Sequence, residues 1–213
     1  MLRGLFKVSG DIILIARLRL AQKEYPSQFW LLFWGMLIST IGASMIWPFL
    51  MIYVSERLKM PLTATASLIP ISSVMGLLSS FLAGPVIDRV RRKWMMVISL
   101  SVNGVYFFLL SHAETLPVLA FLMGLGGVVN PLYRIGVDAM MADLISPEKR
   151  PDAYSLLRMS NNVGVASGPA LGGVLAATSY ILAFYGAAVG MVVYSLLLLF
   201  FAVETIPRLK TQS

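Results

Sequence analysis

The sequence predicts an all-α membrane protein with six transmembrane helices. Of its 213 residues 58% are hydrophobic and 13% are charged, whereas an ordinary soluble domain carries about 25% charged residues. Six segments hold roughly 20 mostly apolar residues each, the length that a helix needs to cross the hydrocarbon core of a bilayer. They span about 29–54, 63–87, 94–111, 117–141, 155–178 and 181–203.

The segments divide the chain into three parts. Residues 1–28 form a mixed-charge arm, in which about 11–22 is either a basic helix on the membrane surface or a solvated segment. Residues 29–204 form the six-helix bundle, and 205–213 form a tail. Aromatic residues near the predicted helix ends, Trp30, Trp47 and Trp94 among them, suit the membrane interface.

The distribution of lysine and arginine predicts the orientation. Fourteen of these residues flank one side of the six segments, and only Arg57 and Lys59 flank the other. Because short cytoplasmic loops are enriched in Lys and Arg, both termini are predicted to be cytoplasmic, in a multi-pass protein of the cell membrane. The net charge of +7 is therefore attributed to topology, and no nucleic-acid partner is expected.

Several chemistries find no support in the residues. The chain has no cysteine and one histidine, His112, so we expect no metal site, and we expect no organic cofactor either. No Ser/His or phosphate-handling motif of an enzyme is recognisable. The sequence therefore predicts a protein that is not an enzyme.

The second segment carries small residues at a spacing of four and ends in a cluster of charge. Ser72, Gly76, Ser80 and Gly84 share one face, and four cations then fill five positions, 89–93. Asp88 lies at the helix C-terminus, where the macrodipole disfavours a carboxylate, so it needs a cation nearby. We expect an ion-pair network at this membrane face that joins Asp88, Asp143, Glu148 and neighbouring arginines.

The fifth segment carries Gly164-Val165-Ala166-Ser167-Gly168-Pro169-Ala170-Leu171-Gly172-Gly173. Gly164, Gly168 and Gly172 share a face, which forms a groove for another helix. Pro169 removes a backbone donor and kinks the helix. Simple packing explains such a groove, and self-association of two copies through Gly168 is a second interpretation.

Two of these motifs together resemble the major facilitator superfamily. Gly84-x-x-x-Asp88-Arg89-x-x-Arg92-Lys93 is similar to the family's loop between helices 2 and 3, with Arg91 where the family usually has glycine. The resemblance implies that this loop gates the cytoplasmic side, where its aspartate engages a second six-helix half. The fifth-segment motif, with Pro169 and Gly173, resembles the family's antiporter motif.

The fourth segment holds the candidates for substrate or proton handling. The family's drug:proton antiporters carry an R-F-L-Q-G-like run, but this chain has Ala120-Phe121-Leu122-Met123-Gly124. Charged residues follow later in the same segment, and an ionisable pair inside the membrane is a candidate functional site. Arg134 and Asp138 are spaced to pair, unless Arg134 extends to the interface. The candidates are Asn130, Tyr133, Arg134 and Asp138.

Four further side chains could line a cavity, although buried packing is the favoured role for each. They are Trp47, Tyr53, Asn103 and Tyr106.

The resemblance covers one six-helix half of the family's fold, built from two inverted three-helix repeats. It implies a secondary active transporter of the multidrug-efflux type, ion-coupled and working by alternating access, with proton coupling possible. We expect a lipophilic small-molecule substrate, a lipid bilayer, and a second half or a second copy as partners. The alternative is a truncated or non-transporting membrane interaction protein.

Overall fold

A computed structural model describes residues 24–205, except for the side chains of residues 85–90. The surface helix suggested over about 11–22 lies outside the described residues, as does the tail beyond Thr205. The side chains of Asp88 and Arg89 are outside them too.

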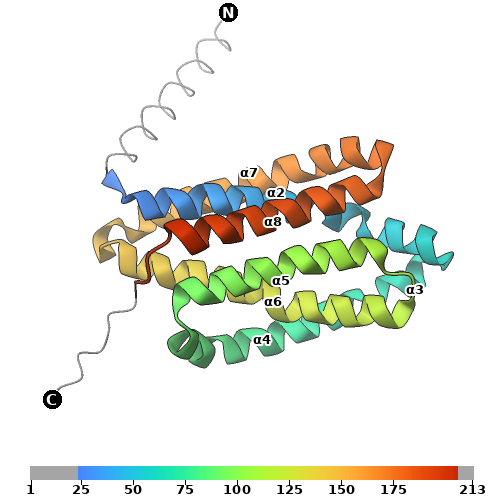
Figure 1. Ribbon diagram of the computed structural model, residues 1–213, viewed down its shortest axis with the longest axis horizontal. Helices are drawn as coiled ribbons and strands as arrows, with labels where there is room; N and C mark the ends of the chain where they lie inside the picture. The colour runs from blue at the N-terminus through green and yellow to red at the C-terminus, as the bar shows by residue number, and fades with distance from the viewer. Residues whose placement is uncertain (1–23, 206–213) are drawn as a thin grey trace, which may run out of the picture.

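The described chain is built of helices, and their long axes run roughly side by side (Figure 1). Long apolar runs form helices here because a helix satisfies its backbone hydrogen bonds within itself. The helices are α2 (Ser27–Leu58), α3 (Leu62–Ala66), α4 (Ile69–Val90), α5 (Arg92–His112), α6 (Leu116–Leu144), the 3-10 helix η1 (Pro147–Lys149), α7 (Arg150–Thr178) and α8 (Tyr180–Phe201).

The second predicted segment is divided into two helices rather than one. The short helix α3 ends at Ala66, and α4 starts at Ile69 with Pro70 in its first turn. A proline is tolerated there because the first amide groups of a helix have no intrahelical acceptor. The predicted 63–87 span is therefore α3 followed by α4.

The charged connection between α4 and α5 is a single residue, Arg91. Its backbone has φ 69° and ψ 142°, and Lys59 is the other described non-glycine residue with positive φ. Positive φ is costly for a residue with a side chain. Arg91, at the position where the resembling family usually has glycine, thus makes this tight turn.

Within the described part of the chain, five helical stretches are long and apolar enough to cross a membrane, one fewer than predicted. They are Ser27–Leu58, Leu62–Gly84, Arg92–His112, Leu116–Leu144 and Tyr180–Phe201. The exception is α7, which has 29 residues but a more polar composition. Polar side chains such as Arg158 and Asn161 lower its hydropathy. By its length α7 nevertheless matches the other helices.

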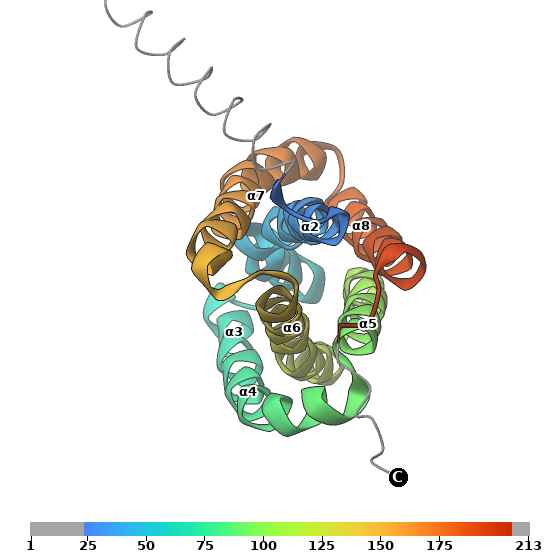
Figure 2. The ribbon, with the colours of Figure 1, turned by 90° about the vertical axis from the view of Figure 1, so that its left-hand side faces the viewer.

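The helices pair in a symmetric pattern, seen end-on in Figure 2. α2 packs on α7, α4 packs on α6, and α5 packs on α8, while α5–α6 and α2–α8 complete the bundle. If α2, α4 and α5 are matched with α6, α7 and α8, each of these contacts maps onto another or onto itself. This is the arrangement expected of two inverted repeats.

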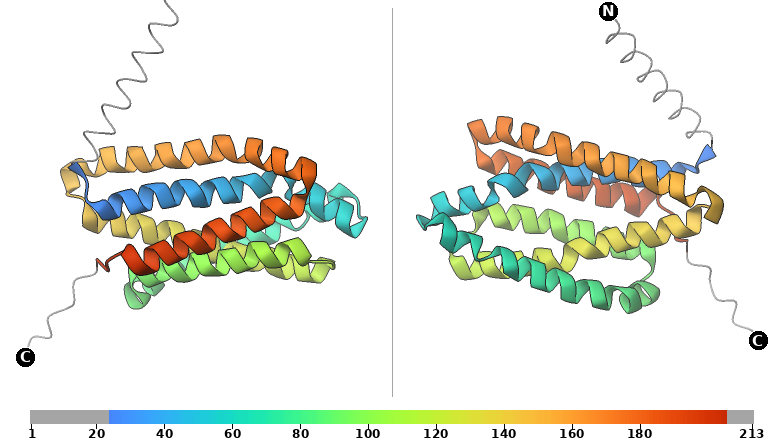
Figure 3. Two further views of the ribbon diagram at one scale, coloured as in Figure 1. Left: turned by 45° about the horizontal axis from the view of Figure 1, so that its top comes forward. Right: turned by 180° about the vertical axis from the view of Figure 1, so that it is seen from behind.

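One end of the bundle, here called the basic end, gathers the start of α2, the α4–α5 turn, the α6–α7 connection and the end of α8 (Figure 3). Lys149 pairs with Glu24 at 2.7 Å, and this hydrogen bond raises the pKa of Lys149. Gln28 donates to the carbonyl oxygen of Val203 at 2.7 Å. The two ends of the bundle sequence are thus held together.

Candidate functional site

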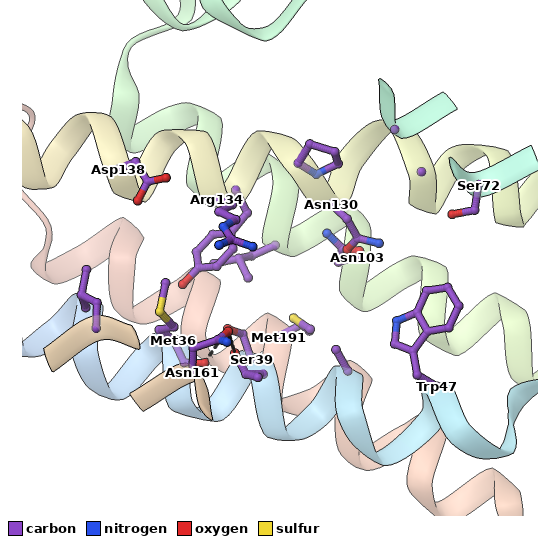
Figure 4. A pocket seen from close by; sticks show the side chains of 18 of the residues that line it. Met36, Ser39, Trp47, Ser72, Asn103, Asn130, Arg134, Asp138, Asn161 and Met191 are labelled. Atoms are coloured by element: carbon purple, nitrogen blue, oxygen red, sulfur yellow. Dashed lines mark hydrogen bonds between the residues drawn. The ribbon is translucent and has the colours of Figure 1, made fainter. Parts of the chain in front are cut away.

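A cavity of about 870 Å³ lies within the bundle (Figure 4). Most of its lining comes from α2, α4, α6 and α7, and α5 and α8 contribute Leu100, Asn103 and Met191. Trp47 lies toward one end of the cavity and Asp138 toward the other, with Asn130 and Arg134 between them. Cavities of this size suit drug-sized ligands.

One face of α6 supplies three polar side chains to the cavity. Asn130, Arg134 and Asp138 follow one another at a spacing of four, which places them on the same side of a helix. All three line the cavity and are exposed within the chain. Tyr133, the fourth candidate on this segment, also lines the cavity, and its hydroxyl donates to that of Tyr194 at 3.2 Å.

Arg134 and Asp138 do not form the ion pair that their spacing allowed. Among the described residues the ion pairs are Arg57–Glu114, Arg92–Asp143 and Lys149–Glu24. The pairing that their spacing allowed is therefore not formed, and both side chains line the cavity. Both charges therefore face the cavity.

The α7 wall adds polar groups that the sequence did not single out. Arg158 falls at the start of the predicted 155–178 segment and was counted only among the flanking cations. α7 begins at Arg150, so Arg158 lies two turns inside the helix and lines the cavity. The Thr40 hydroxyl of α2 donates to Asn161 Oδ1 of α7 at 3.2 Å. An arginine inside a predicted membrane segment was the signal that could have singled out Arg158.

The four undecided side chains divide evenly between cavity and packing. Trp47 and Asn103 line the cavity, while Tyr53 and Tyr106 are buried. Tyr53 donates to the carbonyl oxygen of Ser111 at 2.7 Å. Asn103 is 2% exposed and donates to the carbonyl oxygen of Ser99, but its Oδ1 has no hydrogen-bond partner among the described residues.

The glycine face of α7 packs on α2 of the same chain. A methyl group on Gly164 would lie 2.8 Å from Thr40 Cβ, and one on Gly168 would lie 3.0 Å from the carbonyl oxygen of Ile41. A methyl group on Gly172 would lie closer still to the main chain of Met45, whereas a methyl group on Gly173 would only touch Phe49. The groove is therefore filled by α2, and the expectation that a second copy packs on this face is wrong.

Pro169 lies inside α7, next to this contact, and is half-buried. The helix continues through it to Thr178. The packing on α2 supports the backbone where the proline has no donor.

The small-residue stripe of α4 is covered only in part. A methyl group on Gly76 would lie 3.4 Å from the carbonyl oxygen of Gly127 on α6, and Ser79 donates to the carbonyl oxygen of Val128 at 2.5 Å. A methyl group on Gly84 would meet nothing within 4 Å. The face of α4 that carries these small residues therefore packs on α6 near Gly76 but is uncovered at Gly84, close to the α4–α5 turn.

Arg92 and Lys93, the first two residues of α5, contact the second repeat. Arg92 Nη1 pairs with Asp143 near the end of α6 and donates to the carbonyl oxygen of Ala139 at 2.9 Å. The amide of Lys93 donates to Glu204 at 3.3 Å. Glu148, expected in the same network, is exposed in η1 and is in none of the ion pairs of the described residues.

A six-helix bundle with the contact pattern of inverted repeats and a charged cavity between apolar helices is the architecture typical of secondary transporters. The sequence model of the Major Facilitator Superfamily matches residues 32–213, and the chain belongs to that family.

Three relatives illustrate the range of the family. A Na⁺, Li⁺, K⁺/H⁺ antiporter of Planococcus maritimus is 31% identical over 167 residues, which cover 76% of this chain and 39% of the relative. Multidrug resistance protein 1 of Bacillus subtilis is 30% identical, over 72% of this chain and 39% of the relative. Quinolone resistance protein NorA of Staphylococcus aureus is 22% identical, over 74% and 40%.

The chain spans about two fifths of the length of these curated relatives. Among solved structures, that of the human organic anion transporter MFSD10 (TETRAN) superposes with a TM-score of 0.71 at 19% identity, covering 84% of this chain and 48% of the other. At that identity the match shows the fold alone.

Proposed function

We propose that this chain is one half of a secondary active transporter of the multidrug-efflux type, ion-coupled and working by alternating access. A second six-helix half, from another chain or from a second copy, would close the cavity. The substrate is a lipophilic small molecule. Both termini face the cytoplasm, with the basic end of the bundle on that side, in the cell membrane.

The observation that carries this proposal is the cavity, into which α6 places Asn130, Arg134 and Asp138. Charged side chains within membrane-spanning helices are expensive, and they persist where they contact a water-filled path, a substrate or an ion. Arg134 and Asp138 lie in such a helix and face the cavity. Apolar and aromatic lining residues, including Trp47, Leu100 and Met191, suit the body of a lipophilic molecule.

Ion coupling draws support from the same residues and from the relatives. Asp138 is the acidic group that lines the cavity, and a carboxylate can carry a proton between the two sides. Two relatives are named as an antiporter and a multidrug resistance protein. Residues of the α4–α5 turn, Asp88 and Arg89 with Arg92 and Lys93, are proposed to gate the cytoplasmic side, with Gly84 giving close approach.

A transport assay tests the proposal. Everted vesicles containing the chain, alone or with a co-expressed six-helix second half, are energised and given lipophilic dyes. We expect dye accumulation that an uncoupler collapses and that Arg134→Ala reduces at least about tenfold. Arg57→Ala, at the opposite end from the α4–α5 turn and paired with Glu114, is the matched control and should transport normally.

The proposal is contradicted if vesicles that contain the folded chain accumulate no more dye than empty vesicles, both with and without the second half. That result would favour the alternative function, a membrane interaction protein that does not transport.

A further inference from the structure

The charged groups of the cavity do not balance one another. Arg134, Arg158 and Asp138 all line it, which gives two positive charges against one negative. All three are exposed within the chain, and the ion pairs of the described residues include none of them. The remaining lining residues are uncharged.

Asp138 can compensate only one of the two guanidinium groups. Arg134 and Arg158 both act on it electrostatically. Tyr154, also in the lining, supplies no counter-charge, because its hydroxyl donates to the main-chain oxygen of Asp138 at 2.9 Å. One positive charge of the cavity therefore remains uncompensated by the described residues.

An uncompensated cation between apolar helices is costly, and a ligand that brings the opposite charge removes that cost. Guanidinium groups favour carboxylate and sulfonate-like oxygens because their planar N–H donors can bind two oxygens at once. Asn130, one turn from Arg134, offers an amide donor to the same ligand. Trp47 adds an aromatic ring at the other end of the cavity, where Ser72 and Asn103 also lie.

We propose that the cavity binds an amphipathic organic anion, with its acidic group at Arg134 and its apolar body toward Trp47. This inference rests on the proposed function, since it names the substrate class of the same cavity. Arg158 contributes to the positive field, and Asp138 limits affinity by repelling the ligand's anionic group.

A matched ligand series tests the charge preference on the unmodified chain. 2-Naphthoate, 2-naphthamide and 2-naphthylmethylammonium share one aromatic body and differ in charge. Their affinities are measured by calorimetry with the 213-residue chain in nanodiscs of neutral phosphatidylcholine. We expect 2-naphthoate to bind on the order of tenfold more tightly than the amide, and the ammonium to bind weakest.

Variants of opposite sign separate a binding role from a structural one. Arg134→Gln should remove the preference for naphthoate over naphthamide, and Arg134→Lys should keep part of it. Asp138→Asn should strengthen naphthoate binding several-fold, a gain that damage to the fold does not produce. Arg57→Gln, outside the cavity, is the control and should leave all three affinities unchanged.

The proposal is overturned if the ammonium binds as tightly as naphthoate, or if Arg134→Gln leaves the preference intact. Binding and transport are measured separately. Naphthoate binding without uptake in any vesicle would contradict the proposed function while upholding the anion site. Uptake of cationic dyes by a chain that does not prefer naphthoate would uphold the proposed function and contradict the anion site.

Discussion

Arg92, the first residue of α5, forms an ion pair with Asp143, near the end of α6. The arginine side chain is 21% exposed and the aspartate 26%, so the pair is largely withdrawn from solvent. It joins the α4–α5 turn of the first repeat to the last turn of the helix that opens the second. The same guanidinium group also donates a hydrogen bond to the carbonyl oxygen of Ala139.

Arg92→Ala and Asp143→Ala should therefore be non-additive. Each change leaves a partner charge uncompensated, so each single variant should lose about 1–3 kcal/mol of unfolding free energy. The double variant should lose less than the sum, with a coupling of about 1–2 kcal/mol. Thermal unfolding in detergent measures this, and strictly additive losses would show that the pair contributes nothing.

The close contact of α7 on α2 predicts opposite effects at two adjacent glycines. Gly172→Ala places a methyl group against the main chain of Met45 and should destabilise the protein by about 1–3 kcal/mol. Gly173→Ala, whose methyl group would lie 3.6 Å from Phe49, should be neutral or stabilise by about 0.5 kcal/mol. Equal melting temperatures for the two variants would contradict this packing.

The backbone of Arg91 predicts a stabilising substitution. Arg91→Gly relieves the strain of φ 69° and should raise the unfolding free energy by about 1 kcal/mol. Lys93→Gly removes a cation from the same turn but at a helical position, and it should destabilise instead. Chemical unfolding of both variants checks the signs, and a loss of stability in Arg91→Gly would rule out strain at this turn.

The buried hydroxyl of Tyr53 predicts a larger loss than a similar hydroxyl at the surface. Tyr53→Phe leaves the main-chain oxygen of Ser111 without this donor and should cost about 1–3 kcal/mol. Tyr185 is exposed, with its hydroxyl 3.3 Å from His112, and Tyr185→Phe should change stability by about 0.5 kcal/mol or less. Melting curves that shift equally in both variants would contradict the burial argument.

Membrane orientation can be read directly because the chain has no cysteine. Glu148→Cys, at the basic end, should react with an impermeant maleimide only after cells are opened. Glu56→Cys, near the end of α2, should react in intact cells. Reversed labelling of the two sites would show that the positive charges do not face the cytoplasm.

The sequence predicted the helices well because an apolar run of membrane-spanning length has few alternatives to a helix. It placed several ends too early or too late, since α2 continues through charged residues to Leu58 and α7 starts at Arg150. A charged residue ends an apolar run, but it does not end a helix. Helix ends depend on caps and packing, which hydropathy does not report.

The sequence predicted the cavity residues of α6 but not those of α7. Arg134 and Asp138 stand out because they interrupt an apolar run, whereas Arg158 follows a charged segment that resembles a loop. Spacing showed that the glycines of α7 share a face, but it could not show that α2 fills it. A helix face is local information, and its partner depends on the tertiary fold.

The polar composition of α7 has a consequence for how the chain enters the membrane. The mean hydropathy of α7 is too low for it to count among the candidate membrane spans. Its own side chains therefore give it little tendency to partition into lipid. α2 is synthesised earlier and carries the surface on which Gly164 and Gly172 dock, with Thr40 ready to bond Asn161. We therefore expect α7 to enter the membrane by packing on α2, which is already in place.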